Sequence, residues 1–124
     1  MMHPFRVAIE TGDLDAALAL VHDDVVFKSP VVFTPYEGRE ALRRILSAVV
    51  EVFEDFRYVR EIGTEDARDH ALVFEARVGD KHLEGCDFIR RDDDGVITEL
   101  TVMVRPMKAM LALAEAMKAR LSAT

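Results

Sequence analysis

The spacing of apolar residues changes near Phe53, and this change limits the possible folds more than any other feature of the chain. Before Phe53 the apolar residues recur every three or four positions, which predicts a long helix beginning after Gly38. After Phe53 they recur at every second position, as in strands with one buried face. The expected strands cover about residues 56–62, 71–78, 81–91 and 96–105.

Further helices are expected on both sides of this core. Pro4 is favoured as a first helical residue, and Asp13 caps a second short helix whose apolar stripe runs to Val21. Val25–Ser29 is predicted to be a first strand, and a last helix follows Pro106. Helices on one face of a strongly bent antiparallel sheet bury all these apolar stripes together, so the predicted fold class is α+β.

Composition and charge exclude several classes of protein. The 124 residues contain no low-complexity linker and predict one domain, residues 1–124. The net charge of −7, with scattered lysines and arginines, predicts no nucleic-acid or membrane partner. Acidic Glu10 and Asp13 leave no signal-peptide core, and the single Cys86 cannot form an internal disulfide, so the cytoplasm is the expected location. No Cys/His cluster indicates a metal site, and no cofactor is expected.

Three parts of the chain resemble SnoaL-like proteins of the nuclear transport factor 2-like superfamily. Gly12–Ala17 with Val21–Phe27 resembles their opening, Tyr36–Leu42 the start of their long helix, and Gly85–Asp92 with Gly95–Ile97 their central hairpin. The resemblance implies a cone-shaped domain whose curved sheet and helices enclose an apolar pocket, and a homodimer formed through the exposed sheet face. The superfamily holds isomerases, cyclases, dehydratases, epoxide hydrolases and proteins without known activity, so it does not specify a reaction.

Asp87 is the strongest candidate for chemistry. Alternation places it on the same strand face as Gly85 and Ile89, and burial of that face raises the pKa of the Asp87 carboxyl. A protonated carboxyl donates a hydrogen bond to a ligand oxygen or a developing oxyanion, as in ketosteroid isomerase, which the chain resembles. The alternatives are an ion pair with an arginine or a solvated position. Tyr58, which alternates with Phe56, is expected to help orient a substrate or simply to pack.

Two residues depart from the ketosteroid-isomerase-like pattern. Ser29 stands where that pattern has a general-base aspartate, and a serine hydroxyl is too weakly acidic to act as a base without a helper. Phe5 stands where the pattern has a hydrogen-bonding tyrosine on the first helix. These departures argue against steroid-type 1,3-proton transfer.

The remaining candidates are expected to line the pocket, or alternatively to form ordinary core. They are Phe5, Phe27, Ser29, Phe33, Tyr36, Phe53, Phe74, Val102 and Val104. His22 is expected at a polar rim near the end of the second helix, and His70 and His82 are expected to be solvated. A neighbouring carboxylate argues against a catalytic thiolate at Cys86.

The sequence therefore favours a protein whose pocket binds a small, mostly apolar, oxygen-bearing molecule. In the enzymatic reading, Asp87 and Tyr58 serve an isomerase, cyclase, dehydratase or hydrolase that works without metal or nucleotide. In the rival reading, the same cavity belongs to a non-catalytic ligand carrier or to a homodimeric scaffold.

Overall fold

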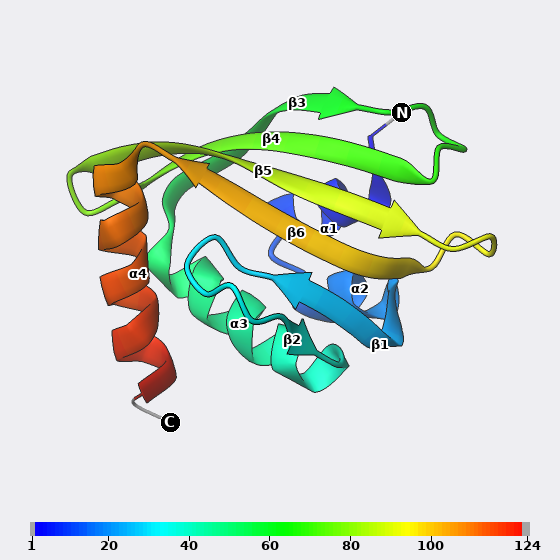
Figure 1. Ribbon diagram of the computed structural model, residues 1–124. Helices are drawn as coiled ribbons and strands as arrows, with labels where there is room; N and C mark the ends of the chain where they lie inside the picture. Colours follow the sequence, from blue (N-terminus) through cyan, green and yellow to red (C-terminus); the bar gives the residue numbers. More distant parts are fainter. Residues whose placement is uncertain (1, 123–124) are drawn as a thin grey trace.

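The computed structural model describes residues 2–122, so residue 1 and residues 123–124 of the expected domain lie outside the described residues. The elements follow one another as helices, a strand pair, a long helix, four strands and a closing helix (Figure 1). In order they are α1 (Pro4–Glu10), α2 (Leu14–Ala19), β1 (Val21–Lys28), β2 (Tyr36–Glu37), α3 (Arg39–Val52), β3 (Glu54–Ile62), β4 (Asp69–Val78), β5 (Lys81–Arg91), β6 (Ile97–Arg105) and α4 (Met107–Ser122).

The strands form one curved sheet in the order β2-β1-β6-β5-β4-β3. Figure 1 shows the sheet arching over α1, α2 and α3, with α4 standing at one end. The predicted α+β class is confirmed. One pairing was not predicted: β1 runs parallel to β6, while the other pairs are antiparallel. Apolar alternation is the same in both directions, so the sequence pattern does not distinguish them.

The change of period at Phe53 marks the end of α3 and the start of β3. The predicted bounds of β5 agree with the structure, but β1 begins at Val21 rather than Val25. Val21 fits the helical stripe of α2 and also an inward position on a strand, and it is buried in β1. His22 therefore lies in β1, exposed, and not near the end of a helix.

Local capping fixes the short N-terminal helices. The Asp13 carboxylate accepts a hydrogen bond from the backbone N–H of Ala16 at 3.0 Å, as predicted for an N-cap. Gly12, between the two helices, has a φ of +74°, a conformation that glycine adopts without steric cost. At α1 the cap is His3, whose ring accepts the N–H of Phe5.

The core lies between the concave sheet face and the helices. The α3 stripe packs against it, and Leu42 is fully buried, which stabilises the fold by roughly 2 kcal/mol relative to an exposed side chain. The strands β4 and β5 contribute alternate buried residues from their inner face. Within residues 2–122, none of the helices has the length and apolar character needed to span a bilayer.

Candidate ligand pocket

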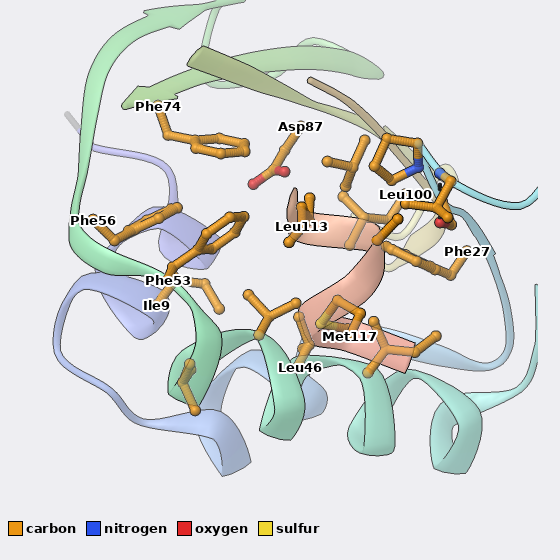
Figure 2. Close-up of a pocket in the computed structure, with 18 of the residues that line it drawn as sticks. Ile9, Phe27, Leu46, Phe53, Phe56, Phe74, Asp87, Leu100, Leu113 and Met117 are labelled. Carbon is orange, nitrogen blue, oxygen red and sulfur yellow. Dashed lines mark hydrogen bonds between the residues drawn. The ribbon is translucent and has the colours of Figure 1, made fainter. Parts of the chain in front are cut away.

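A cavity of about 1000 Å³ lies between the concave face of the sheet and α1, α3 and α4. Apolar side chains make up most of its wall, and Figure 2 shows the Asp87 carboxyl pointing into the space beside Phe74 and Leu113. Its volume is within the range of small-molecule sites. Nine of the expected residues line it: Phe5, Phe27, Ser29, Tyr36, Phe53, Tyr58, Phe74, Asp87 and Val102.

Asp87 faces inward because β5 alternates regularly between its two faces. Gly85, Asp87 and Ile89 are buried, whereas Cys86 and Phe88 are on the opposite face and partly or fully accessible. The Asp87 residue is only 7% exposed. Loss of solvation raises the pKa of its carboxyl to about 7, although the Tyr58 hydrogen bond acts in the other direction. Burial therefore favours the protonated form of this carboxyl.

Tyr58 is the hydrogen-bond partner of Asp87. Its hydroxyl donates to Oδ2 of Asp87 at 2.6 Å, joining the middle of β3 to β5. Burial, and then the nearby charge of Asp87, raise the pKa of Tyr58 well above its ordinary value, so its phenol keeps its proton. The pair thus supplies O–H groups on an apolar wall.

Aromatic rings surround this pair on the β3 and β4 side. The Phe56 ring meets Tyr58 edge-on at a centroid distance of 4.9 Å, and Phe74 lies 5.0 Å from Phe56. Gly85 makes room for this packing, since a Cβ atom there would lie 2.2 Å from Cζ of Phe74. The absent side chain at Gly85 therefore positions the ring that lies beside Asp87.

Ser29 and Phe5 line the pocket without supplying a base or an acid. The Ser29 hydroxyl oxygen accepts the backbone N–H of Val31 at 2.9 Å and that of Val32 at 3.4 Å, so it holds the turn after β1. Phe5 is 1% exposed and contributes only an apolar surface.

Two of the expected wall residues do not line the cavity. Phe33 is 101% exposed, because the segment between Pro30 and Pro35 turns its ring to the outside. Val104 is paired with Gly85 across β5 and β6 and packs against the core instead. Both predictions were wrong because alternation and prolines mark faces and bends, but they do not mark where a cavity ends.

His70 was expected in solvent but is buried. It is placed inward on β4, and its Nε2 lies 2.7 Å from the carbonyl oxygen of Thr64. Its ring packs edge-on against His3, with centroids 4.7 Å apart. Burial, followed by the charges of His70 and Arg91, lowers the pKa of His3 to about 4. His82 is exposed, as predicted.

Sequence reasoning missed Glu10, which lines the cavity from the end of α1. Its carboxylate forms an ion pair with Arg6, four residues earlier, at 3.3 Å. That spacing is a signal the sequence contains, although it does not indicate a pocket.

Burial raises the pKa of the Cys86 thiol, and the charge of Asp87 raises it further. Within the described part of the chain, no three His, Cys, Asp or Glu side chains are grouped so as to hold a metal ion.

This fold, a curved unclosed sheet over helices with an apolar cavity between them, is the cone of nuclear transport factor 2-like proteins. The sequence matches the SnoaL-like domain over residues 4–100, and the chain belongs to that family. A comparison with curated proteins finds no match.

Solved structures with similar sequence share this fold. A steroid delta-isomerase from Pseudomonas aeruginosa is 45% identical, with a TM-score of 0.88, covering 94% of this chain and 85% of that one. An uncharacterized protein with a cystatin-like fold from Silicibacter pomeroyi is 34% identical, with a TM-score of 0.89, covering 98% and 87%. The epoxide hydrolase/cyclase-like enzyme SalBIII of salinomycin pyran ring formation is 18% identical, with a TM-score of 0.67, covering 85% and 87%, and shares the fold alone.

Proposed function

We propose that the protein binds a small, largely apolar molecule that carries a carbonyl or similar oxygen, and that Asp87 is its hydrogen-bond donor. The observation that carries this proposal is a buried carboxyl on an apolar cavity wall, joined to Tyr58 at 2.6 Å. Burial of a carboxyl costs free energy and is typical of functional sites. A protonated carboxyl in an apolar pocket donates a stronger hydrogen bond to a ligand oxygen than a solvated one.

The roles of the two groups follow from their protons. Tyr58 donates a hydrogen bond to Oδ2, which fixes the orientation of the Asp87 carboxyl. The protonated carboxyl then donates to a ligand oxygen, and its donor strength increases as negative charge develops on that oxygen. This favours reactions that pass through an enol or oxyanion, such as isomerisation, cyclisation or dehydration, with hydrolysis also within reach of an acid. The similarity to a steroid delta-isomerase supports the first of these.

A non-catalytic carrier is the second candidate. Two positions support it, because neither supplies a catalytic group. The Ser29 hydroxyl, after β1, already holds a turn, and Phe5 has no polar group. In this case the cavity and Asp87 select an oxygen-bearing ligand but do not change it.

The binding experiment compares hydrophobic ketones with hydrocarbons of the same shape by calorimetry and thermal shift. Wild type is expected to prefer the ketone by at least about tenfold, the worth of a hydrogen bond to a polar group. Asp87→Leu removes the donor and should abolish this preference, whereas Asp87→Asn, which still has an N–H donor, should keep part of it. An unchanged preference for the ketone in Asp87→Leu would refute the assigned role.

We also propose a homodimer formed through the outer face of the sheet. Val73, Cys86 and Met103 adjoin one another across β4, β5 and β6, and Phe88 lies on the same face. Met103 is 58% and Phe88 42% exposed, an apolar surface of the kind that interfaces bury.

A cytoplasmic location stays a prediction from the single cysteine.

Light scattering tests the dimer. Met103→Glu is expected to give a monomer, because a charge would be buried at the centre of the interface. Met107→Glu is the control, since Met107 is 72% exposed on α4 and outside the sheet. A monomeric wild type, or a Met103→Glu variant that remains dimeric, would contradict the proposed interface.

A further inference from the structure

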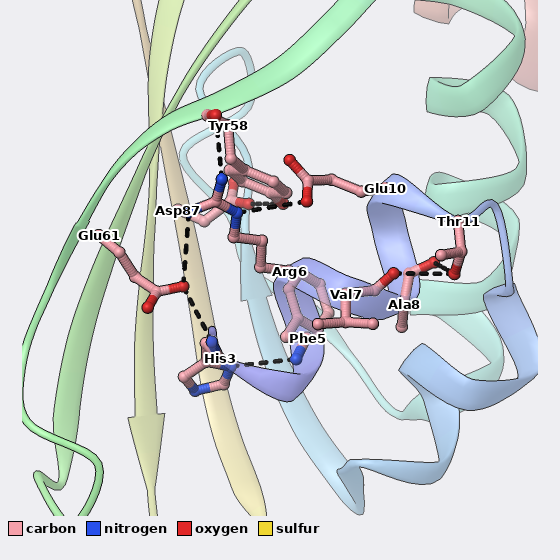
Figure 3. Close-up of polar contacts among 10 residues, drawn as sticks. All are labelled: His3, Phe5, Arg6, Val7, Ala8, Glu10, Thr11, Tyr58, Glu61 and Asp87. Carbon is pink, nitrogen blue, oxygen red and sulfur yellow. Dashed lines mark hydrogen bonds and ion pairs between the residues drawn. The ribbon is translucent and has the colours of Figure 1, made fainter. Parts of the chain in front are cut away.

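Glu10 is a second carboxylate of the same pocket. It is the last residue of α1, and its side chain lines the cavity that contains Asp87. Figure 3 shows this side chain extending from α1 toward Tyr58. The Glu10 carboxylate takes no part in the cap of α1 or in the hydrophobic core.

Arg6 holds the Glu10 carboxylate in place. Its Nε donates to Oε1 of Glu10 at 3.3 Å, and its Nη2 donates to the backbone carbonyl of Tyr58 at 3.4 Å. Glu61 lies 3.9 Å from the same guanidinium. The Arg6 and Glu10 side chains are 21% and 30% exposed, so this ion pair is partly shielded from solvent. Arg6 therefore fixes Glu10 against the strand that carries Tyr58.

The two carboxylates have opposite surroundings. Asp87 is buried on an apolar wall with a phenol as its partner, which favours the protonated acid. Glu10 is next to a guanidinium and partly exposed, so its carboxylate has a cationic partner and access to solvent. The charge of Glu10 also reaches the site, since it contributes to the raised pKa of Tyr58. Unlike environments of this kind separate an acid from a base within one pocket.

We propose that Glu10 is the catalytic base of the pocket and removes a carbon-bound proton from the ketone whose oxygen Asp87 binds. The assignment rests on the proposed function, and it gives the pocket a base that Ser29 does not supply. The substrate is accordingly a hydrophobic ketone or conjugated enone with an acidic C–H next to the carbonyl.

The proposed step is balanced within the pocket. The Glu10 carboxylate takes the proton, and the electron pair of the broken C–H bond becomes the C=C bond of an enol. The carbonyl π pair moves to oxygen, which takes a hydrogen bond or the proton from Asp87. Return of the proton from Glu10 to the same carbon, with any proton on the oxygen going back to Asp87, restores the ketone, and its return to the far carbon of a conjugated system shifts the double bond. No co-reactant is needed.

Deuterium exchange tests this step without knowledge of the natural substrate. Hydrophobic ketones that bind in the calorimetric experiment are incubated with the protein in D₂O, and NMR follows loss of the protons next to the carbonyl. Wild type is expected to accelerate the exchange over buffer. Glu10→Gln, which can still accept a bond from Arg6, should slow it by at least about 100-fold with little change in ketone affinity. Glu10→Asp, with a displaced carboxylate, should retain part of the rate.

A matched control is Glu54→Gln. Glu54 is also ion-paired with an arginine, Arg77 at 3.2 Å, but it does not line the cavity, so exchange should proceed at the wild-type rate. Glu115 of α4 also lines the cavity. Wild-type exchange in Glu10→Gln, or loss of exchange in Glu115→Gln instead, would overturn the assignment of the base. Ketone binding that depends on Asp87 but produces no exchange in wild type would also overturn it, while leaving the proposed binding function intact. If no ketone binds, both proposals fail.

Discussion

Two buried polar clusters lie on the inner side of the same sheet and differ in what they face. Asp87 and Tyr58 border a cavity of about 1000 Å³ and share a hydrogen bond. His3 and His70 pack ring against ring between α1 and β4, and neither lines that cavity. Burial raises the pKa of the Asp87 carboxyl and lowers the pKa of the His3 ring, so it favours the neutral form of each of these two groups.

The protons show why the clusters serve different purposes. His3 Nδ1 accepts the N–H of Phe5, which assigns the ring proton to Nε2. His70 Nε2 faces the carbonyl oxygen of Thr64, which assigns its proton there and leaves Nδ1 as an acceptor. His3 Nε2 and His70 Nδ1 are buried without a hydrogen-bond partner. An unused donor and an unused acceptor are therefore enclosed by protein in this cluster, at a cost in stability, whereas Asp87 presents its carboxyl to a space that a ligand can fill.

A glycine packs against each cluster, Gly63 against His70 and Gly85 against Phe74 beside Asp87. The largest expected effect on stability comes from substitution of Gly63. A Cβ at Gly63, whose φ is +118°, would lie 2.7 Å from Cδ2 of His70 and 3.0 Å from the Asp69 carbonyl oxygen. Gly63→Ala should therefore cost about 3 kcal/mol in urea unfolding, from backbone strain and overpacking. Ketone affinity of the folded fraction should stay at the wild-type value.

Gly85→Ala should reduce stability less than Gly63→Ala but should reduce ketone affinity more. Its Cβ would meet the far end of the Phe74 ring, which can swing into the cavity, so the stability loss should be about 1–2 kcal/mol. The displaced ring occupies the space beside Asp87 and should lower ketone affinity by tenfold or more. Wild-type affinity in Gly85→Ala would show that the ring does not shape the ligand site.

The next effect concerns Asp87 and pH. Its pKa is 3.8 when solvated and about 7 in the fold, so between these values the folded state holds a proton that the unfolded state has released. Stability should therefore fall as pH rises through this window. Asp87→Asn does not titrate and should lose this fall in melting curves recorded between about pH 4.5 and pH 8. A parallel pH dependence in both proteins would contradict a buried acid.

The smallest effect has the opposite sign. The pKa of His3 falls from 6.5 to about 4 on folding, so below pH 6.5 the unfolded state takes up a proton that the folded state refuses. Stability should decline by about 1 kcal/mol as pH drops through this range, because burial, and then His70 and Arg91, oppose the new charge and Glu61 compensates it only in part.

His3→Asn tests this decline. Asparagine keeps an acceptor for the Phe5 N–H but does not titrate, so acid unfolding of the variant should begin at lower pH. His82→Asn, at an exposed position, is the control and should follow wild type. Since the Asp87 and His3 slopes oppose each other in wild type, only the variants separate them. An unaltered acid transition in His3→Asn would place the pH sensitivity elsewhere.

Much of the fold and part of the candidate site could be predicted from spacing alone. Alternation placed Asp87 and Phe74 on the inner face, and the structure agrees. The same rule, continued by two residues from Leu72, would have placed His70 inside; the polar loop before it concealed this. Alternation does not reveal strand direction, so the parallel contact of β1 with β6 was missed.

Contacts between distant segments account for the rest. Glu10 reaches the pocket because the end of α1 lies against β3, a contact that no local pattern encodes. Phe33 was wrongly expected inside, since an aromatic residue between two prolines fits either a wall or an exposed turn. Cavity boundaries depend on which side chains fill the space, and Gly85 shows that a missing methyl group can decide this.

The parallel pairing of β1 with β6 also has a consequence for synthesis on the ribosome. β1 emerges among the first 28 residues, yet the neighbour it needs is Ile97–Arg105. Until that late segment appears, β1 and its short partner β2 lack their link to the main sheet, and the nascent chain exposes apolar surface to chaperones and to other chains. Truncated chains that end before about residue 105 should therefore be aggregation-prone, however well their local helices form.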